Sequence, residues 1–154
     1  MIDTTAYLDR KCIDMLAGMA EEAGISRSKL VVLLLKRVMK DHAALVRYDR
    51  AVRYQERKPV AQRIRLHVVV DLRDYEFFID MRKLFKWSVS FLIAFAVQEH
   101  LDELMAKLAD EKYDEYADNY PYHHYLIIPE KVDSAICWKI YWGIPENLNK
   151  LFPS

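Results

Sequence analysis

The chain contains one pattern twice, and the two copies are separated by a constant offset of sixty-two residues. The matching positions are Leu8-Asp9, Met19 and 26–31 in the first copy, and Val70-Asp71, Met81 and 88–93 in the second. No gap is needed to keep the copies aligned over about thirty positions. Repetition at a fixed period indicates that a chain is built from copies of one structural unit. We therefore expect a doubled small unit.

Each copy begins with an alternating pattern of side chains, at positions 2–8 and 63–70. Alternation with a period of two predicts a β-strand. An aspartate follows, Asp9 or Asp71, and its carboxylate can accept the free N–H groups of a first helical turn. Apolar residues then recur at helical spacing, which predicts an amphipathic helix of about three to four turns.

A second helix is expected after each amphipathic helix. Gly24 can end the first of these by taking a left-handed conformation. Ser26 and Ser88 each carry a hydroxyl that can cap the helix that follows, and that helix is strongly apolar in both copies. The predicted order within a copy is strand, helix, turn, helix.

Three runs of the first copy carry a resemblance to a known family: Thr5-Ala6-Tyr7-Leu8-Asp9, Ala20-Glu21-Glu22-Ala23-Gly24 and Ile25-Ser26-Arg27-Ser28-Lys29-Leu30. They resemble the ribbon-helix-helix family of bacterial DNA-binding proteins, and the resemblance covers residues 2–42. The second copy, about 63–104, is similar in layout but differs in detail. It has Lys86, Trp87 and Phe91 at the positions of Gly24, Ile25 and Lys29.

The resemblance implies a mostly α fold with short β-strands. It implies a tandem ribbon-helix-helix pseudo-dimer, in which an antiparallel two-stranded ribbon lies on four helices. We place the first copy at 1–46, a basic helical connector at 47–62 and the second copy at 63–109. We expect the connector to continue the second helix as far as Pro59. Residues 110–154 form an aromatic, acidic C-terminal region with an expected hairpin.

The formal net charge is zero, but the charges are unevenly distributed. Residues 36–65 include ten Lys or Arg and three acids, whereas residues 101–154 include five basic and ten acidic residues. This asymmetry indicates a basic face for a polyanion and an acidic region elsewhere. The alternative is that the arginines at 47, 50, 53 and 57 form one solvated helix face.

The apolar runs are far shorter than the roughly 20 residues needed to span a bilayer. The chain also does not start with the basic and apolar segments of a secretory signal. We therefore expect a cytoplasmic protein without membrane contact. Cys12 and Cys137 lack ligand-like spacing, and we interpret both as reduced small hydrophobes.

A single strand-helix-helix unit cannot cover its own apolar face, so the two strands are expected to pair antiparallel. Ala6, Leu8, Val68 and Val70 would then face the helices. The opposite face would show Asp3, Thr5, Tyr7, Arg63, Arg65, His67 and Val69. A major groove about 12 Å wide admits such a ribbon, and arginine can bond guanine with two hydrogen bonds. The predicted base readers are therefore Arg63 and Arg65, followed by Thr5, Tyr7 and His67. The alternative role of the two arginines is to keep a strand edge soluble.

Phosphate contacts are expected at the start of the second helix of the first copy. Free N–H groups, the helix dipole and the side chains of Ser26, Arg27 and Lys29 suit a phosphate. The second copy has Val89 and Phe91 instead of the two basic residues. This difference implies either asymmetric docking or another use for the second copy, and the serines can serve as helix caps alone.

The C-terminal region begins with a tyrosine-rich stretch, followed by the runs 126–129 and 135–143, and 129–134 can turn the chain between them. This region either packs on the helices or forms a docking or self-association surface, since aromatic residues dominate interface cores. No motif for a metal, cofactor or nucleophile is present; His123-His124 with Cys137 lacks the spacing of a zinc site. The expected function is sequence-specific binding of double-stranded DNA in transcription regulation, without enzyme activity. The alternative is an antitoxin-like or other protein–protein interaction module that kept the fold and lost DNA.

Overall fold

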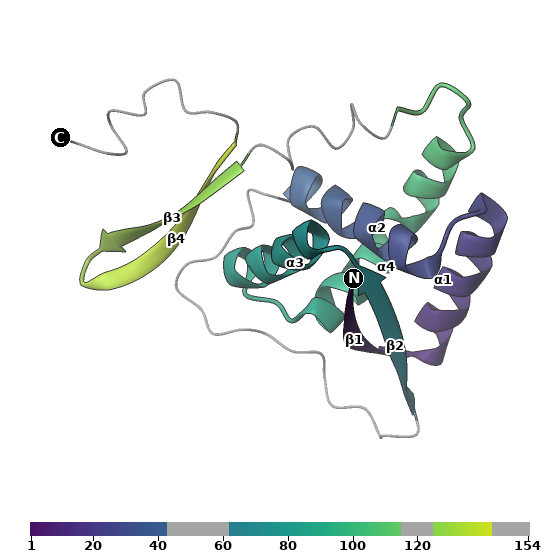
Figure 1. Ribbon diagram of the computed structural model, residues 1–154, viewed down its shortest axis with the longest axis horizontal. Coiled ribbons are helices and arrows are strands. Elements are labelled where there is room, and N and C mark those ends of the chain that lie inside the picture. Colours follow the sequence, from purple (N-terminus) through teal and green to yellow (C-terminus); the bar gives the residue numbers. More distant parts are fainter. Residues whose placement is uncertain (43–61, 115–124, 143–154) are drawn as a thin grey trace. The chain divides into compact units, whose positions relative to one another are not determined.

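The computed structural model describes residues 1–42, 62–114 and 125–142. The chain divides into two compact units, Met1–Tyr113 and Asp114–Ser154. The described part of the first unit is mostly helical, with a short antiparallel sheet (Figure 1). Its elements are β1 (Ile2–Asp9), α1 (Arg10–Ala23), α2 (Arg27–His42), β2 (Arg63–Val70), α3 (Leu72–Phe85) and α4 (Val89–Leu108). The expected connector helix at 47–59 lies outside the described residues.

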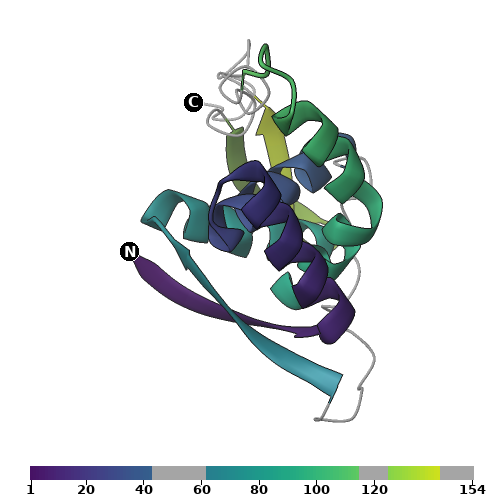
Figure 2. The same cartoon turned by 90° about the vertical axis from the view of Figure 1, so that its right-hand side faces the viewer.

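The two strands of the first unit pair antiparallel, as the alternating patterns predicted. The register joins Ile2 to Val70 at one end and Asp9 to Arg63 at the other. Figure 2 shows the two strands crossing each other along one side of the helices. The inward side chains are almost fully buried; they are Ala6, Leu8, Leu66, Val68 and Val70. The strands therefore close one side of the apolar core.

Local helix signals recur at the same offset as the sequence repeat. The Asp9 carboxylate accepts a hydrogen bond from the Cys12 N–H at 2.8 Å, and the Asp71 carboxylate accepts one from the Asp74 N–H at 2.9 Å. Each bond satisfies one of the N–H groups that a first helical turn leaves without a partner in the helix. The capping aspartates are thus confirmed as the starts of α1 and α3.

The ends of α1 and α3 are also equivalent. Gly24 takes a left-handed conformation with φ of 67°, and Lys86 takes one with φ of 59°. A residue with a Cβ is disfavoured in this region, while glycine is not. The second copy therefore keeps the turn geometry with a less suitable residue.

Two serine hydrogen bonds connect the two copies. The Val69 N–H in β2 donates to Ser28 Oγ in α2 at 2.9 Å, and the Tyr7 N–H in β1 donates to Ser90 Oγ in α4 at 3.0 Å. Each second helix thus bonds the strand of the other copy, with equivalent residues at both ends. Neither copy completes its own backbone hydrogen bonding.

The centre of the core lies where α2 packs against α4. Every residue of α2 from 30 to 39 is buried, and α4 contributes apolar residues such as Leu92, Ile93 and Leu101. Burying a leucine side chain stabilises a protein by roughly 1.5–3 kcal/mol. Burial at the contact between α2 and α4 therefore contributes to the stability of the core.

The described part of the second unit is a hairpin of β3 (Tyr125–Val132) and β4 (Ala135–Trp142). A hairpin was expected, but the predicted turn at 129–134 was wrong in its bounds. Pro129 lies inside β3, opposite Trp138, and only Asp133 and Ser134 form the turn, with φ of 47° and 73°. Two consecutive positive φ values match the twist of a two-residue hairpin turn. An outer strand tolerates proline, because its N–H positions are not all needed for pairing.

Candidate nucleic-acid interface

The outer face of the ribbon combines the residues that the alternating patterns assigned to it. These are Asp3, Thr5 and Tyr7 from β1, and Arg63, Arg65, His67 and Val69 from β2. Arg65 and His67 are exposed, and Tyr7 keeps 48% of its surface. Thr5 and Arg63 are half-buried. The structure thus brings all five predicted base readers to one face.

The register gives this face a centre. Thr5 lies opposite His67, and these residues are also equivalent in the sequence repeat. The pairing register is therefore centred on this pair with respect to the sixty-two-residue offset. Tyr7 lies opposite Arg65 on one side of the centre, and Asp3 lies opposite Val69 on the other. One half of the outer face is basic and aromatic, and the other half is acidic and apolar.

Asp3 is linked to His67 across the ribbon. Both carboxylate oxygens lie 3.2 Å from His67 Nδ1. A neutral imidazole with its proton on Nδ1 donates to this carboxylate, and a protonated one forms an ion pair with it. The contact holds the imidazole on the acidic half of the outer face.

The start of α2 carries the predicted phosphate contacts. Ser26 Oγ accepts a hydrogen bond from the Lys29 N–H at 3.0 Å, so the serine is a helix cap, and Ser26, Arg27 and Lys29 are all exposed. The bond from Val69 to Ser28 ties this turn to the end of β2. The basic side chains therefore lie beside the acidic and apolar half of the outer face.

The start of α4 also has a serine cap, but aromatic side chains surround it. Ser88 Oγ accepts from the Phe91 N–H at 3.2 Å. Trp87 packs between aromatic rings, with centroids 5.0 Å from Phe91, 5.0 Å from Phe95 and 5.8 Å from Phe85. An aromatic cluster thus replaces the basic side chains of the first copy at the equivalent helix start.

A polar cluster between α2 and α4 was not predicted from the sequence. Arg37 Nη2 lies 2.6 Å from Glu103 Oε1, and Arg37 Nε lies 3.6 Å from Asp41 Oδ2. His100 Nδ1 lies 3.7 Å from the same Asp41 oxygen. The hydrogen bond from Arg37 lowers the pKa of Glu103 below its usual value of 4.5. The spacings i, i+4 and i, i+3 are visible in the sequence, but only the packing of α2 on α4 joins them.

The ligand atoms of Asp41, His100 and Glu103 lie within 4.8 Å of one another, a spacing that a metal ion could use. The buried Arg37 guanidinium already neutralises one carboxylate and lies near the other. A second cation would be repelled by this charge. The arrangement therefore fits a structural ion cluster that joins the two helices.

Cys12 has the properties expected of a reduced hydrophobic residue. Its side chain is buried and free of a disulfide. Burial, and then the charge of Asp9, raises the pKa of the thiol to about 11. The thiolate is the reactive form, so the raised pKa lowers the reactivity of Cys12 at neutral pH. The side chain of Cys137 and the residues His123-His124 lie outside the described part of the structure.

Comparison of the chain with protein-family models, with curated proteins and with solved structures finds no significant match. Among the described residues, no helix combines the length and apolar character required to cross a membrane.

Proposed function

We propose that the chain is a tandem ribbon-helix-helix protein and binds double-stranded DNA sequence-specifically, as a bacterial transcriptional regulator in the cytoplasm. The observation that carries the proposal is the antiparallel pairing of β1 with β2, with one face buried and the other polar. The proposal assigns the ribbon to the major groove and assigns no catalytic step or cofactor to the chain.

The dimensions of a two-stranded ribbon suit this role. Outward side chains on one strand repeat every two residues, or about 6.8 Å. Base pairs along B-DNA repeat about every 3.4 Å. Successive outward side chains therefore reach about every second base pair, and the strand spacing of about 4.8 Å lets both strands enter a groove about 12 Å wide.

The residues divide by expected role. Arg65 is the most exposed guanidinium of the outer face and is the proposed main base reader, with Thr5, Tyr7, Arg63 and His67 beside it. Ser26, Arg27 and Lys29 at the start of α2 are the proposed phosphate contacts. The aromatic start of α4 supports a docking mode in which the first copy makes the stronger backbone contacts.

Selection of duplexes from a random pool at two salt concentrations tests the proposal. A consensus sequence should emerge, and its affinity should fall steeply with salt, because phosphate contacts release counterions. Arg65→Ala should then weaken binding to the selected duplex by about 1–3 kcal/mol and relax the sequence preference. Arg73→Ala is the matched control, since Arg73 is exposed on α3 and lies outside the ribbon. Failure to enrich any sequence, or equal losses in both variants, would reject the ribbon as a DNA reader.

Specific features of the outer face favour a second function, a protein-interaction module that kept the fold and lost DNA binding. Asp3 brings a carboxylate to the face, and Val69 remains 41% exposed. In the second unit, Ile136 on the hairpin is 73% exposed, and the hairpin is the proposed surface for a partner or for self-association. Recovery of a stoichiometric small protein with the full chain, together with no duplex enrichment, would favour this function.

A further inference from the structure

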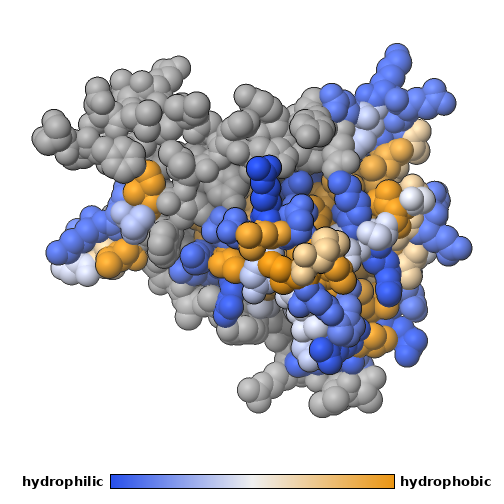
Figure 3. Space-filling model, in the orientation of Figure 1, coloured by the Kyte–Doolittle hydropathy of each residue, from blue (hydrophilic) through white to orange (hydrophobic). Residues whose placement is uncertain are grey.

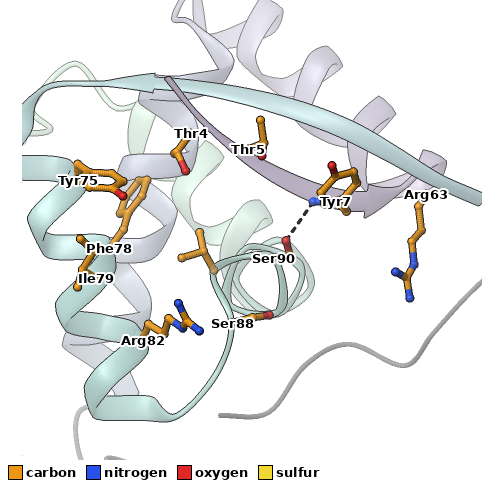
Figure 4. Close-up of a pocket in the computed structure, with 11 residues that line it drawn as sticks. Thr4, Thr5, Tyr7, Arg63, Tyr75, Phe78, Ile79, Arg82, Ser88 and Ser90 are labelled. Carbon is orange, nitrogen blue, oxygen red and sulfur yellow. Dashed lines mark hydrogen bonds between the residues drawn. The ribbon is translucent and has the colours of Figure 1, made fainter. Parts of the chain in front are cut away.

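A groove of about 440 Å³ lies beside β1, between α3 and the start of α4 (Figure 4). Pockets for small organic ligands have volumes of roughly 300–1,000 Å³ and combine apolar walls with a few polar groups. The groove has the size and the mixed chemistry of such a site.

One wall of the groove is apolar. Phe78 forms a buried part of it, Tyr75 is half-buried, and Ile79 keeps 37% of its surface. Val89 continues this wall on α4. Apolar side chains also reach the surface between hydrophilic ones elsewhere on the first unit (Figure 3). In the groove, however, they meet around a hollow and can bury the apolar part of a ligand.

The remaining lining is polar, and its two charged residues are both arginines. Arg82 extends from α3 toward Ser88 at the start of α4, and Arg63 lines the groove from β2 (Figure 4). The positive end of the α4 dipole adds to this charge. No carboxylate is among the described residues that line the groove. The lining therefore complements an anion attached to an apolar body.

The groove is a feature of the second copy. At the positions equivalent to Tyr75, Ile79 and Arg82, the first copy has Ile13, Ala17 and Ala20. Ala20 is buried and brings no charge. Arg82 is exposed, whereas Ala20 is buried, so the guanidinium is not part of the apolar core.

We propose that this groove binds a small amphipathic organic anion, such as an aromatic carboxylate, and that the bound anion opposes DNA binding. The carboxylate lies between Arg82 and the first turn of α4, and the apolar body lies on Tyr75, Ile79 and Val89. Thr5 and Tyr7 belong both to the groove and to the outer face of the ribbon. The proposed ligand site depends only on the lining of the groove, whereas the effect on DNA rests on the proposed function.

The first experiment is a titration of the full chain with 1-naphthoate, followed by amide NMR shifts. Saturable shifts should appear at α3 and at the start of α4, with affinity in the millimolar range or better. The neutral analogue 1-naphthalenemethanol should bind at least tenfold more weakly. Arg82→Gln should remove this preference for the anion, while the control Arg73→Gln, on the same helix but outside the groove, should retain it.

Further arms separate the contributions of the apolar wall and the charge. Ile79→Gln should weaken both naphthyl compounds severalfold, and thermal unfolding of each variant verifies that it folds. Inorganic phosphate should not displace 1-naphthoate at equal concentration. Absence of saturable shifts, equal binding of the alcohol, unchanged naphthoate affinity in Arg82→Gln, or displacement by phosphate would each overturn the amphipathic-anion site.

The effect on DNA is measured with a selected duplex. Saturating 1-naphthoate should raise the apparent Kd for DNA severalfold in the parent chain and leave it unchanged in Arg82→Gln. An unchanged Kd in the parent chain would overturn the opposition to DNA binding. If no duplex is selected at all, the proposed function fails, and the NMR titration still decides whether the groove binds the anion.

Discussion

The starts of α2 and α4 share a backbone plan and differ in almost every side chain around it. Both use a serine cap, Ser26 or Ser88, and both send a second serine hydroxyl to the strand of the other copy. Arg27 and Lys29 in one copy are replaced by Val89 and Phe91 in the other. The hydroxyls are what the fold needs, and the flanking side chains are free to serve different contacts.

The largest expected effect tests whether the two copies share one core. Leu30 and Leu92 are equivalent in the repeat, and both are fully buried. Leu30→Ala and Leu92→Ala should each lower the free energy of unfolding by about 2–5 kcal/mol, because each leaves a cavity. Urea unfolding should show a single transition in both variants. Two separate transitions would contradict a shared core.

The basic helix start should matter for DNA more than its aromatic counterpart. Replacing Arg27 and Lys29 together by alanine should weaken binding to a selected duplex by about 2–3 kcal/mol and reduce the salt slope by roughly 2. Val89→Ala is the control at the equivalent helix start and should leave the salt slope unchanged. Equal salt slopes in the parent chain, the double variant and Val89→Ala would show that Arg27 and Lys29 do not contact phosphates.

The interlocking hydrogen bonds allow a direct comparison of equivalent serines. Ser28→Ala removes the acceptor of the Val69 N–H, and Ser90→Ala removes the acceptor of the Tyr7 N–H. Each should cost about 1 kcal/mol of stability, since the strand N–H then relies on water. Chemical denaturation measures both losses. A cost for only one serine would show that the two ends of the ribbon are not equivalent.

Substitutions at the two left-handed residues, Gly24 and Lys86, should change the stability of the chain in opposite directions. Gly24→Ala should destabilise the chain by about 1 kcal/mol through backbone strain alone, because a Cβ there meets no atom within 4 Å. Lys86→Gly should relieve the same strain and stabilise by roughly 0.5 kcal/mol, reduced by the entropy of glycine in the unfolded chain. Thermal unfolding of the two variants provides the measurement. A shift in the same direction would exclude strain as the cause.

The smallest effect concerns acid stability. The pKa of Glu103 is lowered in the folded chain, so its contribution to stability is present above about pH 4.5 and is lost as the pH falls through the folded pKa. The contribution should be below about 1 kcal/mol, because the Glu103 side chain is 52% exposed and water screens the ion pair. Urea midpoints below and above pH 4.5 should differ less in Glu103→Gln than in the parent chain. If the urea midpoints of Glu103→Gln and of the parent chain depend on pH in the same way, the acid sensitivity comes from groups other than Glu103.

The features predicted correctly from the sequence depend on local signals or on the repeat. Alternation identified the strands, the aspartates marked the helix starts, and the repeat indicated that β1 would pair with β2. The left-handed Lys86 could be inferred only from its alignment with Gly24, because lysine alone gives no such signal. The bounds of the turn between β3 and β4 were wrong because Pro129 was taken as a turn residue.

Features that depend on tertiary packing were not predictable. The ion cluster of Arg37, Asp41, His100 and Glu103 forms only when α2 crosses α4. The groove likewise needs Arg82 on α3 to meet Ser88 beside β1. Each helix contributes two polar groups to the ion cluster, and the spacing within one helix does not show that the two pairs meet.

Both strands of the ribbon belong to one polypeptide, so its assembly is a unimolecular step and dilution does not dissociate it. A ribbon built from two identical chains exposes the same residues on each side of its axis and matches a palindromic target. Here covalent linkage removes that constraint, and each strand can change without altering the other. A surface of this kind is suited to a target whose two halves differ.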